Sequence, residues 1–415
     1  MKTIHSIFLV LILSLNLNAQ NESNSPYSRF GIGELQRFST ATQSAMGGVG
    51  VASSDPLAIN FSNPASYSTV FKQRFIMQTG GVHTTKLLQT ESQNQVANAT
   101  NFNYLIFGFP IHKSWGASIG LLPYSDMSYS FTDVNIDPQA NLYFEGNGGI
   151  TQFYFGNALS INKNISVGAN ISYLFGNLNT SRKVVFNDTD IFNTRSNDDT
   201  SIKGLNFDFG FQYKATIKNW QTVLGITLDE GGEISAKRTL LTETFRSNGE
   251  LEVVEDTVLN NTLADGQLTL PTALGFGIAL ENDKWKILAD YNTQNWSEYL
   301  LFGDNDNLEN SSKISLGGEF VPDKKSINKY FKMIRYRFGL YTAKTYLNLK
   351  NQQLNENAVT LGLGLPLKRS GTLFNISAEL GQVGTTNDEL IKESFARFKV
   401  GFIFSDIWFV KRKFN

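Results

Sequence analysis

The chain has 415 residues, with 36 Lys and Arg, 37 Asp and Glu, and a formal net charge of −1. A chain so close to neutral has no general electrostatic attraction for nucleic acid or anionic lipid, so we expect no nucleic-acid partner. It contains no cysteine, which excludes disulfides and thiolate metal ligands.

The first 19 residues predict a secretory signal peptide. Lys2 provides the positive end, residues 7–17 are apolar, and Ala19 is a small residue at the expected cleavage site. A membrane anchor is the alternative, but the apolar run is short for a spanning helix. We therefore expect the mature chain to begin near residue 20.

Residues 20–69 are rich in Ser, Asn, Gly and Ala and show no regular apolar alternation. They include Asn63-Pro64, where the proline removes a backbone donor and biases the asparagine away from the α region. Irregular backbone of this kind can be buried within a closed barrel. The segment therefore predicts an N-terminal plug or hatch; the alternative is a disordered periplasmic tail, with an ordinary turn at Asn63-Pro64.

From residue 70 onward the apolar period is two. In residues 205–213, LNFDFGFQY, the odd-numbered residues are large and apolar and the even-numbered residues are polar or glycine. A soluble sandwich would turn the apolar face inward, whereas a membrane barrel would turn it toward lipid. The alternation alone leaves both architectures open.

Strand number and loop length separate these two architectures. The predicted strands are 70–82, 101–111, 114–122, 150–161, 165–176, 201–214, 220–228, 270–281, 285–293, 312–321, 334–343, 358–367, 372–380 and 395–404. Their lengths centre near the ~9–11 residues that a tilted transmembrane strand needs. Short turns such as 282–284 alternate with long connections such as 123–149 and 177–200, apart from the moderate linker 322–333. This pattern favours an outer-membrane barrel with its long loops outside the cell.

The predicted fold is therefore all-β: a transmembrane antiparallel β-barrel of about 14 strands spanning residues 70–415, with the plug of residues 20–69 in its lumen. The connection 229–269 is long enough to hold a further hairpin, because ISAKRTLL and LEVVEDTVL both have strand-like composition. We expect that hairpin to extend above the membrane.

Catalytic and metal sites are poorly supported. His83 and His112 fall at predicted strand ends on opposite sides, and no carboxylate/His spacing suggests a metal ligand set. We expect no enzyme activity, no metal and no cofactor. A lipid-modifying hydrolase remains the alternative if a serine lies within hydrogen-bond reach of either histidine.

Three cations occupy the polar face of predicted strands: Arg335, Arg337 and Lys399. They are either part of a solvated lumen wall or a cationic spot that binds the carboxylate of an amphipathic solute, for which arginine offers a forked geometry.

Two stretches resemble the FadL-type family of outer-membrane transporters of hydrophobic compounds. The first is MGGVGVASSDPLAINFSNPASYS, whose matching residues, the candidate hatch and gating residues, are Gly47, Gly48, Gly50, Asp55, Asn63, Pro64 and Ala65. In the second, residues 268–299, the matching positions are Leu270, Pro271, Gly275, Gly277, Asp290, Trp296 and Ser297. Arg337-Phe338-Gly339 with Tyr341 is a weaker match.

The resemblance implies a fourteen-stranded barrel closed by an N-terminal hatch in the outer membrane of a Gram-negative bacterium, in contact with its lipid. It implies passive uptake of hydrophobic or amphipathic small molecules, such as long-chain fatty acids, gated by that hatch. The polar N-terminal segment and the tail after residue 404 depart from the family pattern. The alternative is therefore a FadL-like accessory of type IX protein secretion or cell-surface attachment, with a secretion-machinery partner.

Overall fold

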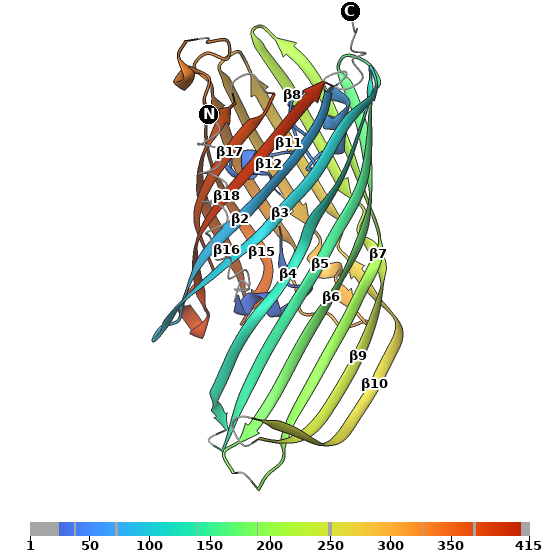
Figure 1. Cartoon of the computed structure of the whole chain (residues 1–415), viewed down its shortest axis with the longest axis vertical. Coiled ribbons are helices and arrows are strands. Elements are labelled where there is room, and N and C mark those ends of the chain that lie inside the picture. Colours follow the sequence, from blue (N-terminus) through green and yellow to red (C-terminus); the bar gives the residue numbers. More distant parts are fainter. Residues whose placement is uncertain are drawn as a thin grey trace, which may run out of the picture.

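A computed structural model describes residues 25–36, 39–70, 74–137, 139–188, 190–247, 251–326, 328–367 and 371–407. The predicted signal peptide and the tail 408–415 lie outside these ranges. The described chain is a tall, tilted β-barrel (Figure 1). None of its helices is both long enough and apolar enough to cross a membrane.

Fourteen strands form a closed ring, in which each strand pairs antiparallel with both of its neighbours. They are β2 (Arg74–Gln89), β3 (Asn94–His112), β4 (Trp115–Asp137), β5 (Ala140–Ser160), β6 (Ile165–Phe186), β7 (Asn193–Ile217), β8 (Trp220–Asp229), β11 (Ala273–Glu281), β12 (Trp285–Gln294), β14 (Ser311–Phe320), β15 (Arg335–Leu349), β16 (Gln352–Pro366), β17 (Leu373–Val383) and β18 (Lys392–Ile407). The last strand closes the ring on the first, because β18 pairs with β2 along its whole length. The prediction of a barrel of about 14 strands is confirmed, and each predicted range overlaps one ring strand.

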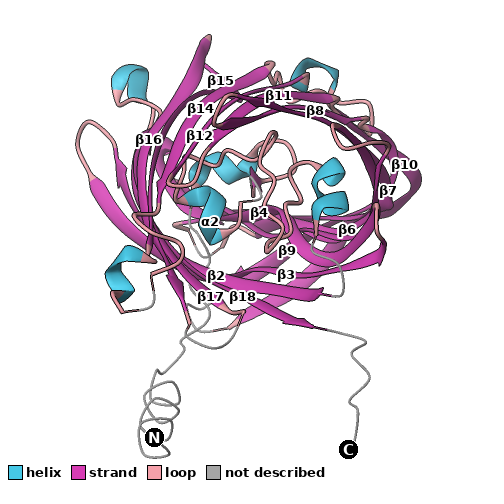
Figure 2. Cartoon of the chain, turned by 90° about the horizontal axis from the view of Figure 1, so that it is seen from above, coloured by secondary structure: helices cyan, strands magenta, loops and turns pink. Residues whose placement is uncertain are grey.

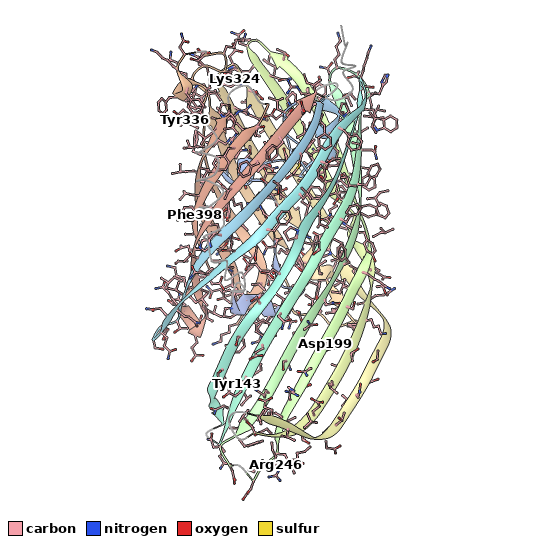
Figure 3. All side chains as sticks on the ribbon, in the orientation of Figure 1. Tyr143, Asp199, Arg246, Lys324, Tyr336 and Phe398 are labelled. Carbon is pink, nitrogen blue, oxygen red and sulfur yellow. The ribbon has the colours of Figure 1, made fainter. Side chains whose placement is uncertain are left out.

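The ring has an apolar outer face and a polar inner face. On β7, Leu205, Phe209 and Phe211 are 53%, 44% and 37% exposed, whereas the alternate residues Asn206 and Gln212 are 1% and 0% exposed. The same outward display of aromatic and aliphatic side chains covers the rest of the ring, as at Phe398 on β18 (Figure 3). An apolar outer belt around a polar interior is the arrangement that lipid requires of a transmembrane barrel.

Two predicted loops are instead strands. Residues 123–149 and 177–200 were expected as long loops, but β4 and β5 continue through the first range, and β6 and β7 through most of the second. These extensions carry polar residues on both faces, so they lack the apolar alternation from which strands are recognised. The extra hairpin in 229–269 is confirmed as β9 (Gly232–Ser247) and β10 (Glu252–Leu270).

Together these extensions form a sheet that projects beyond one end of the ring, the lower end in Figure 1. Its strands are the outer parts of β4–β7 followed by β9, which pairs with β7 from Asn193↔Phe245 to Lys203↔Ser235, and then β10. We call the strand residues 125–137, 140–150, 177–186, 193–203, 232–247 and 252–270 the projecting sheet.

The described N-terminal residues form short elements inside the ring, where Figure 2 shows α2 and adjoining loops. These elements are η1 (Pro26–Arg29), β1 (Glu34–Leu35), α2 (Ala41–Ser44) and η2 (Pro64–Thr69). Four short elements lie in the connections between ring strands: η3 (Trp296–Glu298), β13 (Leu300–Leu301), η4 (Tyr330–Lys332) and η5 (Asn387–Glu389). Met46, Val49 and Ala52 are buried against side chains of the ring strands. We call residues 25–70 the N-terminal segment.

Candidate functional site: the N-terminal segment and the lumen

Asn63, Pro64 and Ala65 form the start of η2. The Asn63 side chain caps this helix by accepting a hydrogen bond from the Ala65 amide at 3.0 Å, and Pro64 occupies the first turn, where its missing N–H has no cost. The side-chain nitrogen of Asn63, Nδ2, donates to the Val51 carbonyl at 2.7 Å and to the Phe211 carbonyl of β7 at 3.2 Å. This corner is therefore fixed both to the N-terminal segment and to the barrel wall.

Two wall residues that face this corner, Gly168 on β6 and Gly210 on β7, have no room for a side chain. A Cβ added at Gly210 would lie 2.2 Å from Asn63 Oδ1, and one added at Gly168 would lie 2.5 Å from the Pro64 carbonyl carbon. Backbone contact this close is a known use of glycine in strands. The wall and the corner are thus matched in shape.

The glycine run of the N-terminal segment presents amide hydrogens to the wall. Gly47 and Gly48 have φ of +72° and +80°, which favour glycine. The Gly47 amide donates to Thr360 Oγ1 at 2.9 Å. The Gly50 and Val51 amides both donate to Asp290 Oδ2, at 2.6 and 2.9 Å. Asp290 therefore holds the segment by two charge-assisted hydrogen bonds.

Asp55 and two of the predicted lumen cations belong to one ion-pair network. Arg335 Nη1 lies 3.1 Å from Asp55 Oδ2 and 3.5 Å from Glu319 Oε1, and Arg337 Nε lies 2.7 Å from Glu319 Oε2. Burial by itself would raise the pKa of Asp55, but the positive charges of Arg335 and Lys286 outweigh it and lower that pKa to about 2. The carboxylate of Asp55 is therefore charged when it meets Arg335.

Lys399, the third predicted cation, lies apart from that network. Its Nζ donates to Ser39 Oγ at 2.8 Å, and it lines a cavity of about 140 Å³ between the N-terminal segment and the wall. Eight charged side chains line this cavity: Glu34, Lys86, Lys313, Glu356, Glu379, Glu393, Arg397 and Lys399. The idea that the three cations bind a solute carboxylate stays a prediction; the structure shows carboxylates of the protein itself beside Arg335 and Arg337.

A second luminal cavity, of about 290 Å³, adjoins the Pro64 corner and is lined by Asp208, Asp229 and Asp290. Sequence reasoning placed Asp208 on the inner face of its strand and matched Asp290 to a family motif, but it did not bring the three carboxylates together. Alternation indicates which face a residue occupies, whereas the grouping depends on strand register, which a sequence pattern leaves open.

The candidate metal-ligand residues do not form a cluster in the part of the chain that the structure describes. Within it, no three His, Cys, Asp or Glu side chains are placed to hold a metal ion. His83 Nδ1 lies 2.8 Å from Thr100 Oγ1, and its Nε2 lies 3.5 Å from Thr85 Oγ1, so the imidazole contacts threonine hydroxyls.

A fourteen-stranded antiparallel barrel with an apolar belt and an N-terminal segment in its lumen has the fold of FadL-type outer-membrane channels. The toluene transporter TodX of Pseudomonas putida superposes with a TM-score of 0.60 at 15% identity, over 91% of this chain and 100% of that one. The toluene transporter TbuX of Ralstonia pickettii gives a TM-score of 0.57 at 15% identity, covering 89% and 98%. A FadL homologue of Pseudomonas aeruginosa gives 0.60 at 12% identity, covering 90% and 98%.

The family itself is defined by the sequence. A family model described as BamG matches residues 1–415, and the chain therefore belongs to the BamG family. No curated protein matches the sequence at a significant level. Because the solved structures share so little sequence with this chain, they establish its fold and leave its cargo and partners open.

Proposed function

We propose that this protein resides in the outer membrane of a Gram-negative bacterium and acts there as an accessory of a protein-handling machine, in secretion or in surface attachment. In this proposal the projecting sheet lies outside the cell and holds an extended segment of a partner protein. The observation that carries the proposal is the open edge of β10.

Strand β10 is paired on one side along most of its length. It forms a ladder with β9 from Glu252 to Leu270, while its other described pairing is limited to Leu268 and Thr269, which meet β13. All residues of 251–262 are exposed, including Val253 at 59% and Val258 at 63%. A long edge strand with exposed apolar side chains is a template for another strand.

Natural proteins protect such edges with charged side chains, especially lysine, with proline, with β-bulges or with a covering element. The β9–β10 ladder has register shifts at Val254/Asp256 and Thr257/Leu259. Residues 252–262, EVVEDTVLNNT, contain neither lysine nor proline. An extended peptide that adds to this edge would form main-chain hydrogen bonds, and its alternate side chains would contact the valines. We therefore infer that the edge is kept open for a partner.

The charge of the edge indicates what kind of partner fits it. Glu252, Glu255 and Asp256 lie within five residues of one another. Glu252 pairs with Lys183 and Arg195, and Glu255 lies 3.5 Å from Arg246. A second copy pairing in a register that sets Glu252 opposite Asp256 would place like charges directly across from each other, which destabilises a strand pair. A partner strand with apolar residues and Lys or Arg is complementary.

The lumen supports an accessory role better than an apolar passage. Small-molecule sites are lined mostly by apolar and aromatic side chains, whereas the cavity beside the N-terminal segment has eight charged residues in its lining. The N-terminal segment is also held by Asp290, by Thr360 and by the Asp55–Arg335 ion pair. We propose that it serves as a fixed plug.

The chain has no cysteine, so a single introduced thiol reports contacts at one position. In intact cells, Val258→Cys on the β10 edge should crosslink to a protein partner, whereas Asn305→Cys in an exposed loop should not. A variant with its single cysteine at Asn260 should also crosslink. Adding Val253→Lys and Val258→Lys to that variant should abolish its crosslink, and the same two substitutions should lower the surface display of exported proteins several-fold. Unchanged display and no crosslink at Val258 would contradict the accessory role.

A second candidate function is passive uptake of hydrophobic or amphipathic molecules such as long-chain fatty acids, gated by the N-terminal segment. One observation favours it: the ladder between β3 and β4 ends at Leu105↔Leu121 although both strands continue. Beyond that point β3 and β4 no longer pair with each other: β3 keeps only its pairing with β2, and β4 pairs with β5 and with the short strand β1. The ring wall therefore parts there.

Uptake of a labelled long-chain fatty acid by a deletion strain, with and without the restored gene, separates the two candidates. The accessory role predicts equal uptake and reduced surface display. A several-fold loss of uptake with normal display would favour the channel.

A further inference from the structure

Asp208 and Asp229 form an acidic pair in the lumen. They are register partners on the adjacent antiparallel strands β7 and β8, which places their Cβ atoms roughly 4.5–5.5 Å apart. Both line the 290 Å³ cavity that Phe61 and Pro64 of the N-terminal segment also line. The two carboxylates are thus accessible from the cavity and close enough to share one ligand.

The partners of this pair within the described residues are neutral donors. Ser172 Oγ donates to Asp208 Oδ2 at 3.4 Å, and the Asn206 side-chain nitrogen and the Gly231 amide donate to Asp229 Oδ1 at 2.9 and 3.0 Å. No described Lys, Arg or His forms an ion pair with either carboxylate. Two like charges held this close need a positive charge or a proton between them.

Asn206 provides a separate observation at the same place. The side chain is 1% exposed, its nitrogen is bonded to Asp229, and its Oδ1 is buried with no hydrogen-bond partner. A buried acceptor without a partner is costly and rare. A cation beside the pair would satisfy this oxygen, whereas a proton shared between the carboxylates would leave it unpartnered.

We propose that Asp208, Asp229 and the Asn206 side-chain oxygen bind one Ca²⁺ ion. Calcium is a hard cation that takes carboxylate and amide oxygens, with water completing a flexible shell. Two carboxylates and one amide leave several positions for cavity water. The expected affinity is that of a weak extracellular site, with Kd on the order of 10⁻⁴–10⁻³ M.

The site also explains how a cation could steady the N-terminal segment. Ser172 joins Asp208 to β6, where the neighbouring inward residue Asn170 accepts a hydrogen bond from the Tyr67 hydroxyl of η2 at 3.1 Å. Pro64 lies at the rim of the same cavity. The pair lies near the base of the projecting sheet, because β8 ends at Asp229 and β9 begins at Gly232. The inference does not use the proposed docking at the β10 edge, so a failure of one leaves the other standing.

Calcium binding by the full-length protein in detergent tests the proposal. Isothermal titration with CaCl2 at constant ionic strength should show one saturable site in the wild type and a higher thermal midpoint with Ca²⁺ than with a chelator. Asp208→Asn and Asp229→Asn should each weaken binding at least tenfold. The control Asp283→Asn removes an equal charge at an exposed turn and should bind as wild type does.

Folding of each variant is checked by the heat-dependent gel mobility of the barrel. Asn206→Leu removes the proposed amide ligand without changing the net charge, and it should also weaken Ca²⁺ binding. Absence of saturable binding in the wild type at about 10 mM Ca²⁺, roughly ten times the weakest expected Kd, would reject the site. Equal binding by wild type and the folded variants would also reject it, as would a midpoint that depends on pH but not on Ca²⁺.

Discussion

Strands β6 and β7 each run through two different environments. On the outer face of β6, the residues within the ring are Ile171, Tyr173 and Phe175, which are 39–49% exposed. The next residues on that face are Asn177, Asn179 and Ser181. Strand β7 changes at the same level, because Phe175 pairs with Lys203 and Tyr173 pairs with Leu205. Figure 3 places Tyr143, Asp199 and Arg246 on the part that projects below the ring in that view.

The change shows where lipid gives way to water on the outer face. The backbone ladder continues across that level, so the strands form one sheet. Only the polarity of the outer-face side chains changes at that level, because an unpaired polar group is costly in hydrocarbon and acceptable in water. The projecting sheet is therefore a water-exposed platform supported by the membrane-embedded ring.

The largest expected effect comes from the ion pair inside the ring. Arg337 is 2% exposed and bonds both Glu319 and Asn375 at 2.7 Å. Arg337→Ala should lower the free energy of unfolding by about 3–5 kcal/mol, because it leaves a buried carboxylate with weaker compensation. Denaturant unfolding in lipid vesicles measures the change.

A double-mutant cycle with Glu319→Ala controls this prediction. The double variant should recover part of the loss, since the uncompensated charge is removed. A loss below about 1 kcal/mol in Arg337→Ala, the level of a surface pair, would show that the lumen behaves like the exposed sheet.

A charge on the outer face gives the next largest effect. Phe209→Arg introduces a cation among the lipid-facing residues of β7 and should cost about 2–4 kcal/mol near the bilayer midplane. The matched variant Thr132→Arg changes an exposed residue of the projecting sheet and should stay within about 0.5 kcal/mol of wild type. Equal losses in the two variants would contradict the membrane level assigned above.

The sequence predicted the ring well because lipid imposes one rule on every ring strand. Large apolar residues must alternate with polar or small ones, as they do in residues 205–213, and turns such as 282–284 are short. The projecting parts of β4–β7 were not predicted as strands, because a sheet with water on both faces does not require apolar residues to alternate with polar ones. Their strand structure depends on the pairing of neighbours, such as Asn197 with Ser181 and Leu241.

The site was predictable in part. Alternation predicted that Arg335, Arg337 and Lys399 lie on the inner face. Arg337 and Lys399 are 2% and 8% exposed, and Arg335 contacts Asp55 of the N-terminal segment. Their partners were not predictable from alternation. Glu319 meets Arg337 through the register of the adjacent strands β14 and β15, and Ser39 meets Lys399 through the position of the N-terminal segment in the lumen. The Asp208–Asp229 pair similarly depends on the register of β7 and β8, which no local pattern specifies.

The smallest expected effect lies in the ion pairs of the projecting sheet. Lys183 Nζ lies 2.7 Å from Glu252 Oε1, and both side chains are about one-third exposed, at 28% and 33%. Arg195 contacts the same glutamate at 3.0 Å and would keep it paired. Lys183→Ala should therefore cost about 0.2–1 kcal/mol, and less at high salt, because exposed pairs are solvated and screened. Denaturant unfolding at two salt concentrations measures it, and a loss as large as that of Arg337→Ala would mean that a further protein or lipid surface shields this pair from water.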